Sequence, residues 1–304
     1  MDKVSVIIPT HNRDKVLSRA VKSAMAQTYR NIEILVVSDG FNIKTRSLVN
    51  SLKEKDNRIK FYEYEPAKGG NFARNYGIEK SKGRYVAFLD DDDDEWHNQK
   101  IEKQLEIFNN NDNIGLVYTG IHIIFANEKN DYNFHPKIDG NLNKMILLKN
   151  LIGTTSTVMI KKEVFKEIGV FDEELNAKQD YELWIRICQK YEIGKAKDIL
   201  VNYYNESNNN QISTSLDKYI TANSYIEEKH KLLFQKLSNK ELNQYYANNN
   251  LELANIALRN NDGKSARIYI KRSFLNKKRL YLVLVYLLSF FDYKYFIKLR
   301  KMKS

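Results

Sequence analysis

The stretch YVAFLDDDDDEW, residues 85–96, decides the fold of this chain. Its first five residues are apolar and predict a buried strand, and the next five, Asp90 to Asp94, are all aspartates. Carboxylates packed this closely repel one another unless a cation lies among them. Hard oxygen ligands suit Mg²⁺ or Mn²⁺, usually shared with a phosphate group of a ligand. The alternative is a solvated acidic loop after a strand, and the aspartates alone do not decide between the two.

Strand and helix patterns alternate from the start of the chain up to this stretch. Short apolar runs predict strands at 4–8, 32–37 and 59–64, and apolar residues at helical spacing predict helices at 13–29, 45–56 and 71–80. Such alternation implies parallel strands with helices on both faces of the sheet. Ligands bind beyond the carboxyl ends of strands in sheets of this kind, so Asp39 and Asp90 can face a common crevice.

The later part of the chain changes from mixed to helical patterns. After the aspartates we expect these elements in order: a helix at 99–109, strand-rich sequence at 114–125, a polar loop at 127–133, a loop and strand at 153–160, and helices at 163–168 and 180–191. The Asn-rich stretch 205–210 predicts a boundary between a domain at 1–205 and a basic helical region at 206–304.

Within the basic region, small residues recur over 245–274 as in a helical hairpin, with a turn near 260–263 that resembles one tetratricopeptide-like unit. The apolar run 280–291 is too short to span a bilayer as one helix. Two interpretations of this run remain open, a packed terminal helix and an interfacial membrane anchor.

Composition indicates a soluble or peripheral globular protein. The chain of 304 residues is long enough for one large domain or two. It is 42% hydrophobic and 29% charged. The single cysteine, Cys188, cannot form an internal disulfide, which fits a reducing compartment. We expect no secretory signal, because Met1 is followed almost at once by a strand-like segment. The five histidines lack the spacing of metal ligands.

The net charge of +11 is concentrated at the end of the chain. Residues 240–304 hold 14 Lys and Arg against 4 Asp and Glu, so this tail alone carries +10. Such asymmetry indicates an anionic partner, either a membrane surface or nucleic acid, although a solvated helical face is the plainer alternative.

Five motifs occur in a recognisable order: VSVIIPTHNR at 4–13, VSDG at 37–40, GNFARNYGI at 70–78, GRYVAFLD at 83–90 and QDYELWIR at 179–186. In order and spacing they resemble a family-2 glycosyltransferase, over residues 3–205. The resemblance implies a GT-A fold, an α/β fold with a Rossmann-like mixed sheet flanked by helices, here followed by a C-terminal α-helical extension. It also implies a metal-dependent enzyme, using Mn²⁺ or Mg²⁺, that transfers a hexosyl or N-acetylhexosaminyl group from a nucleotide-diphosphate donor with inversion.

The resemblance assigns roles to individual residues. Asp180 matches the catalytic base, with Trp184 and Arg186 expected to shape the acceptor side. Asp39 matches the residue that binds the base, typically uracil, and Arg74 matches an arginine near the diphosphate. The full set expected at the donor is Pro9, Thr10, Arg13, Asp39, Arg74, Asp90 and Asp91, and the metal ligands are expected among Asp90, Asp92 and Asp93.

The chain departs from the family pattern at three places. An extra residue before the Glu95-Trp96 pair allows two metal motifs, 90/92 counted from the strand or 91/93 counted from Trp96, and we favour the strand-anchored one. Gln179 replaces the usual acidic residue before the base, which should leave the pKa of Asp180 less raised. The stretch 205–211 lacks the basic or histidine residue that often lies near the phosphates.

The expected function is therefore transfer of a sugar, from a UDP donor, to a polysaccharide or glycolipid precursor. We expect the enzyme in the cytoplasm, peripheral at the inner face of the membrane, with residues 240–304 on an anionic surface. A sugar nucleotidyltransferase is an alternative, but its Gly-rich first loop is missing at 9–13. A nucleic-acid-binding protein is less expected, since the tail lacks a recognisable binding module with alternating aromatic and basic residues. The donor sugar, acceptor, linkage and oligomeric state stay open.

Overall fold

The structure is a computed structural model that describes residues 2–91, 94–125, 131–205 and 215–290. The chain forms two compact units. The sheet unit comprises Met1–Leu142, Ile152–Glu174 and Gln179–Ser207, and the helical unit comprises Asn143–Leu151, Leu175–Lys178 and Asn208–Ser304.

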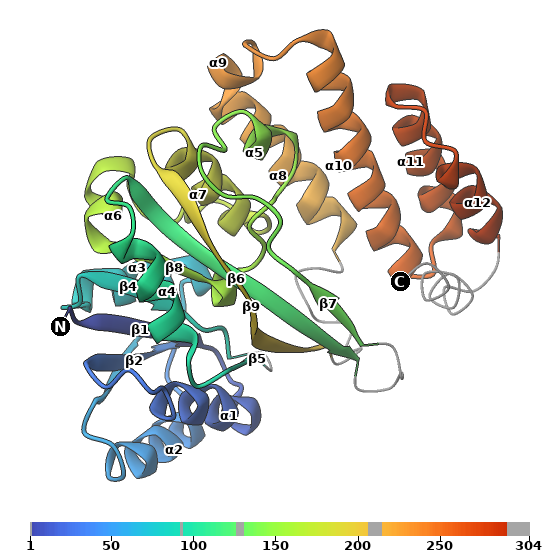
Figure 1. Cartoon of the computed structure of the whole chain (residues 1–304). Helices are drawn as coiled ribbons and strands as arrows, with labels where there is room; N and C mark the ends of the chain where they lie inside the picture. Colours follow the sequence, from blue (N-terminus) through green and yellow to red (C-terminus); the bar gives the residue numbers. More distant parts are fainter. Residues whose placement is uncertain (1, 92–93, 126–130, 206–214, 291–304) are drawn as a thin grey trace. The chain divides into compact units, whose positions relative to one another are not determined.

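The described residues of the sheet unit form nine strands and a set of helices around them (Figure 1). The strands are β1 Val4–Thr10, β2 Ile32–Asp39, β3 Ile59–Tyr64, β4 Tyr85–Phe88, β5 Asp94–Trp96, β6 Ile114–Phe125, β7 Tyr132–Phe134, β8 Val158–Lys161 and β9 Glu192–Asn205. The helices are α1 Asp14–Met25, α2 Ile43–Lys53, α3 Gly70–Lys80, α4 Lys100–Asn109, the 3₁₀ turn η1 Thr155–Thr157, α6 Lys162–Ile168 and α7 Gln179–Cys188.

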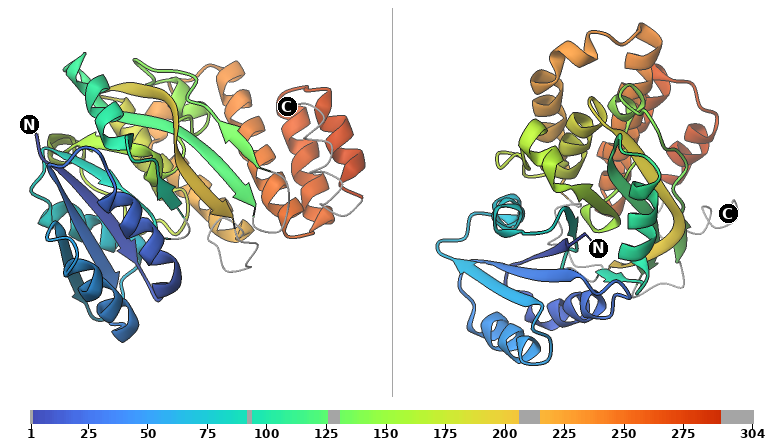
Figure 2. Two further views of the ribbon diagram at one scale, coloured as in Figure 1. Left: turned by 60° about the horizontal axis from the view of Figure 1, so that its bottom comes forward. Right: turned by 60° about the vertical axis from the view of Figure 1, so that its left-hand side comes forward.

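The sheet is mixed, in the order β3-β2-β1-β4-β8-β6-β9-β5, and β7 pairs with β6. Strands β3, β2, β1 and β4 are parallel, so their carboxyl ends lie along one edge. Strand β8 runs antiparallel to both β4 and β6, whereas β9 runs parallel to β6. The long β6 and β9 ribbons lie side by side in both views of Figure 2. This arrangement confirms the predicted α/β class with a mixed sheet.

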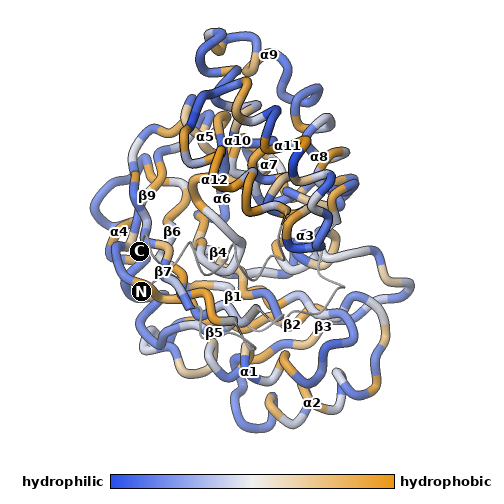
Figure 3. Tube along the Cα trace, turned by 90° about the vertical axis from the view of Figure 1, so that its right-hand side faces the viewer, coloured by the Kyte–Doolittle hydropathy of each residue, from blue (hydrophilic) through white to orange (hydrophobic). Residues whose placement is uncertain are grey.

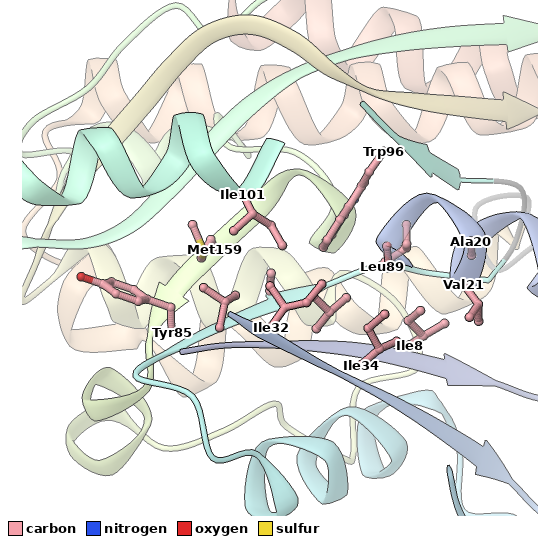
Figure 4. Packing of buried hydrophobic residues seen from close by; sticks show 14 of the residues in the cluster. Ile8, Ala20, Val21, Ile32, Ile34, Tyr85, Leu89, Trp96, Ile101 and Met159 are labelled. Carbon is pink, nitrogen blue, oxygen red and sulfur yellow. The ribbon is translucent and has the colours of Figure 1, made fainter. Parts of the chain in front are cut away.

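The core lies on both faces of the parallel strands. Figure 4 shows Ile8 and Ile34 of the strands packed with Ala20 and Val21 of α1 on one face. Ile7 points to the other face, where α3 covers β1. A Cβ on Gly77 would lie 2.5 Å from Cγ2 of Ile7, so glycine at this position lets the helix approach the strand closely. Burial on both faces explains why β1 is buried along its whole length.

Some predicted elements agree with the structure and others need correction. The strands at 59–64 and 114–125 have the predicted bounds. The predicted polar loop at 127–133 is wrong at its end, because Tyr132 and Asn133 belong to β7, which pairs with β6. The fourteen-residue strand β9 was not predicted. Its lysines and aspartate interrupt the alternation of apolar residues, and its pairing with β6 contains register shifts that a period-two pattern does not follow.

The helical unit contains α5 Met145–Leu148, α8 Leu216–Lys229, α9 Lys231–Phe234, α10 Asn239–Arg259, α11 Gly263–Asn276 and α12 Tyr281–Leu288. Ser238 and Glu241 form a capping box at the start of α10. Helices α10 and α11 pack together as the predicted hairpin, and Asp262 in its turn accepts a 3.0 Å hydrogen bond from the Ser265 amide. The C-terminal part is therefore helical, as expected.

The apolar run near the end of the chain forms α12, the mostly orange helix in Figure 3. Leu282 and Val285 are buried in a cluster with Ala266 and Ile270 of α11, so one side of α12 packs within the helical unit. Across the described ranges, we find no helix with the length and apolar character needed to cross a membrane.

Candidate functional site

The predicted site residues gather where the parallel strands end. Thr10 is the last residue of β1, Asp39 is the last residue of β2, and Asp90 follows β4 by two residues. Thr10 pairs with Ser38 and Ile7 pairs with Phe88 in the parallel register. The topology therefore brings three separate sequence motifs to one edge of the sheet, as predicted for those of Asp39 and Asp90.

Asp39 organises the loop that precedes α3. The residue is 7% exposed, and its Oδ1 accepts hydrogen bonds from the Tyr64 hydroxyl at 2.9 Å and the Lys68 amide at 2.6 Å. The Gly69 amide donates to Oδ2 at 2.9 Å. Burial, together with the Asp39 carboxylate, raises the pKa of Tyr64, so its hydroxyl stays protonated and continues to donate. Asp39 is thus fixed in place at the strand end.

The loop after β1 lies next to this carboxylate. His11 Nδ1 is 2.5 Å from the main-chain oxygen of Asp39, and Asn12 has a left-handed φ of 56°. Pro9 and Thr10 are buried within β1. The Thr10 hydroxyl oxygen is buried and has no hydrogen-bond partner among the residues described here. Arg13 precedes α1, and its Nη1 is 3.7 Å from Oδ1 of Asp91.

Asp90 is held by an arginine and two hydroxyl groups. Arg74 Nη2 is 2.6 Å from Oδ1, and the Thr155 hydroxyl donates to Oδ2 at 2.6 Å. The Asp90 amide donates to the Ser156 hydroxyl oxygen at 3.0 Å. Arg74 comes from α3, whereas Thr155 and Ser156 belong to η1. A charge-assisted pair with little solvent exposure is stronger than a surface pair, so this contact orients both side chains.

The loop 153–157 connects the acidic cluster with α7. The Trp96 indole donates to the main-chain oxygen of Ser156 at 2.9 Å, and the Trp184 indole donates to that of Gly153 at 3.0 Å. Gly153 has a φ of 96°, a conformation that favours glycine. Sequence reasoning missed the role of Thr155 and Ser156, although the unusual run of hydroxyl residues TTST at 154–157 was a signal.

Asp180 lies in the first turn of α7, one helical turn before Trp184. It is half-buried, and its Oδ1 accepts a 2.7 Å hydrogen bond from the Tyr181 amide. Trp184 is fully buried and does not itself line a surface, and its indole holds the loop 153–157. Its role on the acceptor side stays a prediction. The loop 153–157 therefore contacts both Asp90 and, through Trp184, the helix that carries Asp180.

Arg186, also expected on the acceptor side, makes contacts within the protein that the sequence did not predict. Its guanidinium group binds Glu182 at 2.7 Å and donates to the main-chain oxygens of Ile168 and Val170 at 2.5 and 2.7 Å. These carbonyl groups lie at and just after the end of α6, where helices leave acceptors unsatisfied. Arg186 therefore joins α7 to the end of α6.

The predicted metal ligands are only partly described. Asp92 and Asp93 lie outside the described residues, and the described ones include no group of three or more His, Cys, Asp or Glu able to hold a metal ion. Both oxygens of Asp90 have protein partners, and Asp91 faces Arg13. Carboxylate oxygens are the donors that Mg²⁺ and Mn²⁺ prefer, so the chemistry of the cluster fits such a cation. The choice between the 90/92 and 91/93 motifs stays a prediction.

Comparison with known proteins shows the family of this chain. The sequence matches the family model Glycosyl transferase family 2 over residues 5–169, and the chain belongs to this family. An uncharacterized glycosyltransferase of Rickettsia typhi is 37% identical over 206 residues, which are 65% of this chain and 62% of that relative. The chain therefore spans less than two thirds of that relative's length.

Solved structures show the same fold. Staphylococcus aureus TarS 1–349 in complex with UDP-GlcNAc matches with a TM-score of 0.58 and 18% identity, over 96% of this chain and 80% of that one. The Pyrobaculum calidifontis mannosyltransferase PcManGT, in complex with GDP-Man and Mn²⁺, matches with a TM-score of 0.58 and 13% identity, over 97% and 83%. The predicted GT-A fold with a helical C-terminal part is confirmed.

Proposed function

We propose that this chain is an inverting glycosyltransferase that moves a hexosyl or N-acetylhexosaminyl group from a nucleotide-diphosphate donor, with UDP as the nucleotide, to an acceptor hydroxyl. The observation that carries the proposal is the contact of Arg74 and Thr155 with Asp90, at the same sheet edge that ends in Asp39. The edge thus combines a fixed carboxylate for a nucleobase with cationic groups for a diphosphate.

The donor would lie along the ends of β1 and β2. Asp39 accepts from the base, because a carboxylate held by two loop amides needs no reorganisation when a ligand arrives. The buried Thr10 hydroxyl offers a further polar group beside it. Arg13 and Arg74 suit a diphosphate, since guanidinium groups bind phosphate oxygens in a fork geometry. The 2.6 Å pair with Asp90 orients Arg74 before the donor binds, and Arg13 lies 3.7 Å from Asp91.

A divalent cation would be held by Asp90, Asp92 and Asp93, with Asp91 beside it. When bound, such a cation offsets the negative charge that grows on the departing diphosphate. The relation to a neighbour that holds Mn²⁺ supports this part of the proposal. The pairing of Asp90 with Arg74 also reduces the repulsion among the aspartates.

Asp180 would act as the general base. Its carboxylate accepts the proton of the acceptor hydroxyl as the hydroxyl oxygen forms a bond to the anomeric carbon. The bond from that carbon to the diphosphate breaks on the opposite side, so the configuration inverts. Support comes from the position of the half-buried Asp180 at the start of α7, with Trp184 of the same helix bound to the loop that holds Asp90. Gln179 beside it adds no further negative charge.

The acceptor would be a polysaccharide or glycolipid precursor at the cytoplasmic face of a membrane. The charge of +10 on residues 240–304 supports an anionic surface as partner, because lipid-linked acceptors are themselves held at such surfaces. Nucleic acid is not the proposed partner.

The experiment is incubation of the full chain with Mn²⁺ and a panel of UDP- and GDP-sugars, with the released nucleotide identified. We expect UDP from one or a few UDP-sugars, and loss of release after chelation of the metal. Release of pyrophosphate from a sugar phosphate and UTP would support a nucleotidyltransferase instead. Failure to bind or hydrolyse any sugar nucleotide would contradict the proposal.

A further inference from the structure

The outer face of α12 is apolar and exposed. While Leu282 and Val285 pack inside the helical unit, Leu280 is 87% exposed and Leu287 is 56% exposed. The whole set, which we call the α12 stripe, is Leu280, Val283, Leu284, Leu287 and Phe290. Leu280, just before the helix, and Val283, Leu284 and Leu287 follow the i, i+3, i+4, i+7 spacing that places side chains along one face of a helix, and Phe290 lies just after its end. Single exposed leucines are ordinary, but a continuous stripe marks an interaction surface.

The surroundings of the stripe carry one sign of charge. Residues 263–290 contain seven basic side chains and no Asp or Glu: Lys264, Arg267, Lys271, Arg272, Lys277, Lys278 and Arg279. Helix α11 adds exposed Ile268 and Leu275 among its lysines. Arg267 and Lys271 lie over the rings of Phe290 and Tyr286, so positive charge continues along the contact between α11 and α12.

A pocket with two basic side chains adjoins the start of the stripe. A pocket of about 470 Å³ is lined by Met145, Leu148, Lys149, Leu151, Gln244, Asn248, Arg279 and Tyr281. Arg279 and Tyr281 flank Leu280, the first residue of the stripe, and Arg279 donates a 2.8 Å hydrogen bond to Asn248. Lys149 and Arg279 in a pocket beside exposed leucines suit the phosphate of a lipid headgroup whose chains lie next to it.

We propose that the α12 stripe docks this protein on an anionic lipid bilayer, with the leucines at the acyl boundary and the surrounding lysines and arginines at the headgroups. Helix α12 itself has no charged side chain, so the basic residues beside the stripe come from α11 and from the turn before α12. Apolar side chains that enter the acyl boundary next to basic side chains at the headgroups suit the interface of an anionic membrane. The inference deepens the proposed function and rests on it for its purpose. Lipid binding itself needs no sugar transfer, so the two tests fail independently.

Two other partners fit the surface less well. Nucleic acid would meet the basic residues, but aliphatic side chains such as Leu280 and Leu287 provide neither stacking nor base contacts. A second copy of this chain would bury the stripe, but it would bring two basic surfaces together. The bilayer satisfies both the apolar and the cationic parts at once.

The test is flotation of the full chain with vesicles of phosphatidylcholine, with and without phosphatidylglycerol. We expect binding only when the anionic lipid is present, and weakening of that binding by salt. The double variant Leu280→Gln, Leu287→Gln should bind about tenfold or more weakly, because two apolar insertions are lost. Lys264→Gln with Lys278→Gln should weaken binding about fivefold for each lysine. Leu232→Gln, at an exposed leucine of α9, is the matched control and should bind as the parent does.

The outcomes separate the alternatives. The proposal is supported if the leucine double variant no longer floats with vesicles but still hydrolyses the donor at the parent rate. Failure of the parent to float overturns the proposal, as does equal flotation of the leucine double variant. Binding to RNA that competes with vesicles and survives the leucine changes would identify nucleic acid as the partner. A dimer of the parent that becomes a monomer in the leucine variant, without vesicle binding, would assign the stripe to a second copy.

Discussion

The Thr155 hydroxyl donates a 2.6 Å hydrogen bond to Asp90, across 65 residues of sequence. The loop 153–157, which contains Thr155, also accepts hydrogen bonds from two indole groups. Trp96 follows the acidic cluster, and Trp184 lies on the same helix as Asp180. This one loop therefore contacts the carboxylate proposed for the donor and the helix proposed to carry the base. We infer that the hydrogen bonds of this loop hold Asp90 and the helix of Asp180 in a fixed position relative to each other.

Replacement of Thr155 by valine tests this role. The change keeps the shape of the side chain but removes the donor to a carboxylate, and such bonds contribute about 1.5–3 kcal/mol. We expect UDP affinity in the presence of Mn²⁺ to fall by about tenfold, measured by titration calorimetry. Thr28→Val is the matched control, because Thr28 donates to a surface carboxylate of Glu102 at 2.7 Å. Equal weakening by both variants would show that the site is not involved.

Arg74 should be intolerant even of lysine. Lysine keeps the charge but loses the fork geometry that binds Asp90 and suits a diphosphate. We expect Arg74→Lys to weaken UDP binding by about tenfold to a hundredfold. Arg84→Lys alters a comparable 2.8 Å pair with Asp2 that is far more exposed, and it should leave binding unchanged. Parent-like UDP affinity in Arg74→Lys would remove Arg74 from the donor site.

The sequence predicted the parallel strands and the motifs at their ends because both depend on local patterns. Asp39 and Asp90 follow apolar runs, and the topology of alternating strands and helices then places them along one edge. The partners of Asp90 were beyond such reasoning. The run TTST at 154–157 marks a loop rich in hydroxyl groups, but it does not indicate that Thr155 reaches Asp90, since this contact depends on β8 pairing antiparallel to β4. Strand β9 was missed for a related reason, because its pairing with β6 is irregular.

Lys100 is a buried amine whose charge opposes folding. It is 0% exposed, donates to Gln104 at 2.7 Å and lies over the Trp96 ring. Desolvation lowers its pKa well below the ordinary value. Between this lowered pKa and the unfolded value of about 10.4, the unfolded chain binds one more proton, so stability rises with pH by about 1.4 kcal/mol per unit.

Lys100→Met should remove this contribution. We expect the difference in unfolding free energy between the parent and Lys100→Met to shift by about 1.4 kcal/mol per pH unit in favour of the parent as the pH rises within that window. Denaturant unfolding at several pH values measures it. Lys103→Met, on the solvent side of the same helix and paired with Asp198, should show no such slope. Parallel pH curves for the parent and Lys100→Met would contradict the expectation.

Cys188 should be unreactive in the folded protein. Burial raises the pKa of its thiol to about 12, and the residue is 2% exposed. Only the thiolate reacts with disulfide reagents, so at pH 8 we expect no reaction with Ellman's reagent in the native state and one equivalent after unfolding in guanidinium. Rapid reaction of the native protein would show that α7 opens around this residue.

The most direct test of the account is sugar transfer by Asp180→Asn, measured together with donor binding. The amide keeps the size of the side chain but cannot accept the proton of the acceptor hydroxyl. We predict that transfer falls by about a hundredfold or more while UDP binds as tightly as to the parent, and that Asp198→Asn, at a half-exposed surface carboxylate, retains full transfer. Transfer by Asp180→Asn at the parent rate would contradict the central claim that Asp180 is the base.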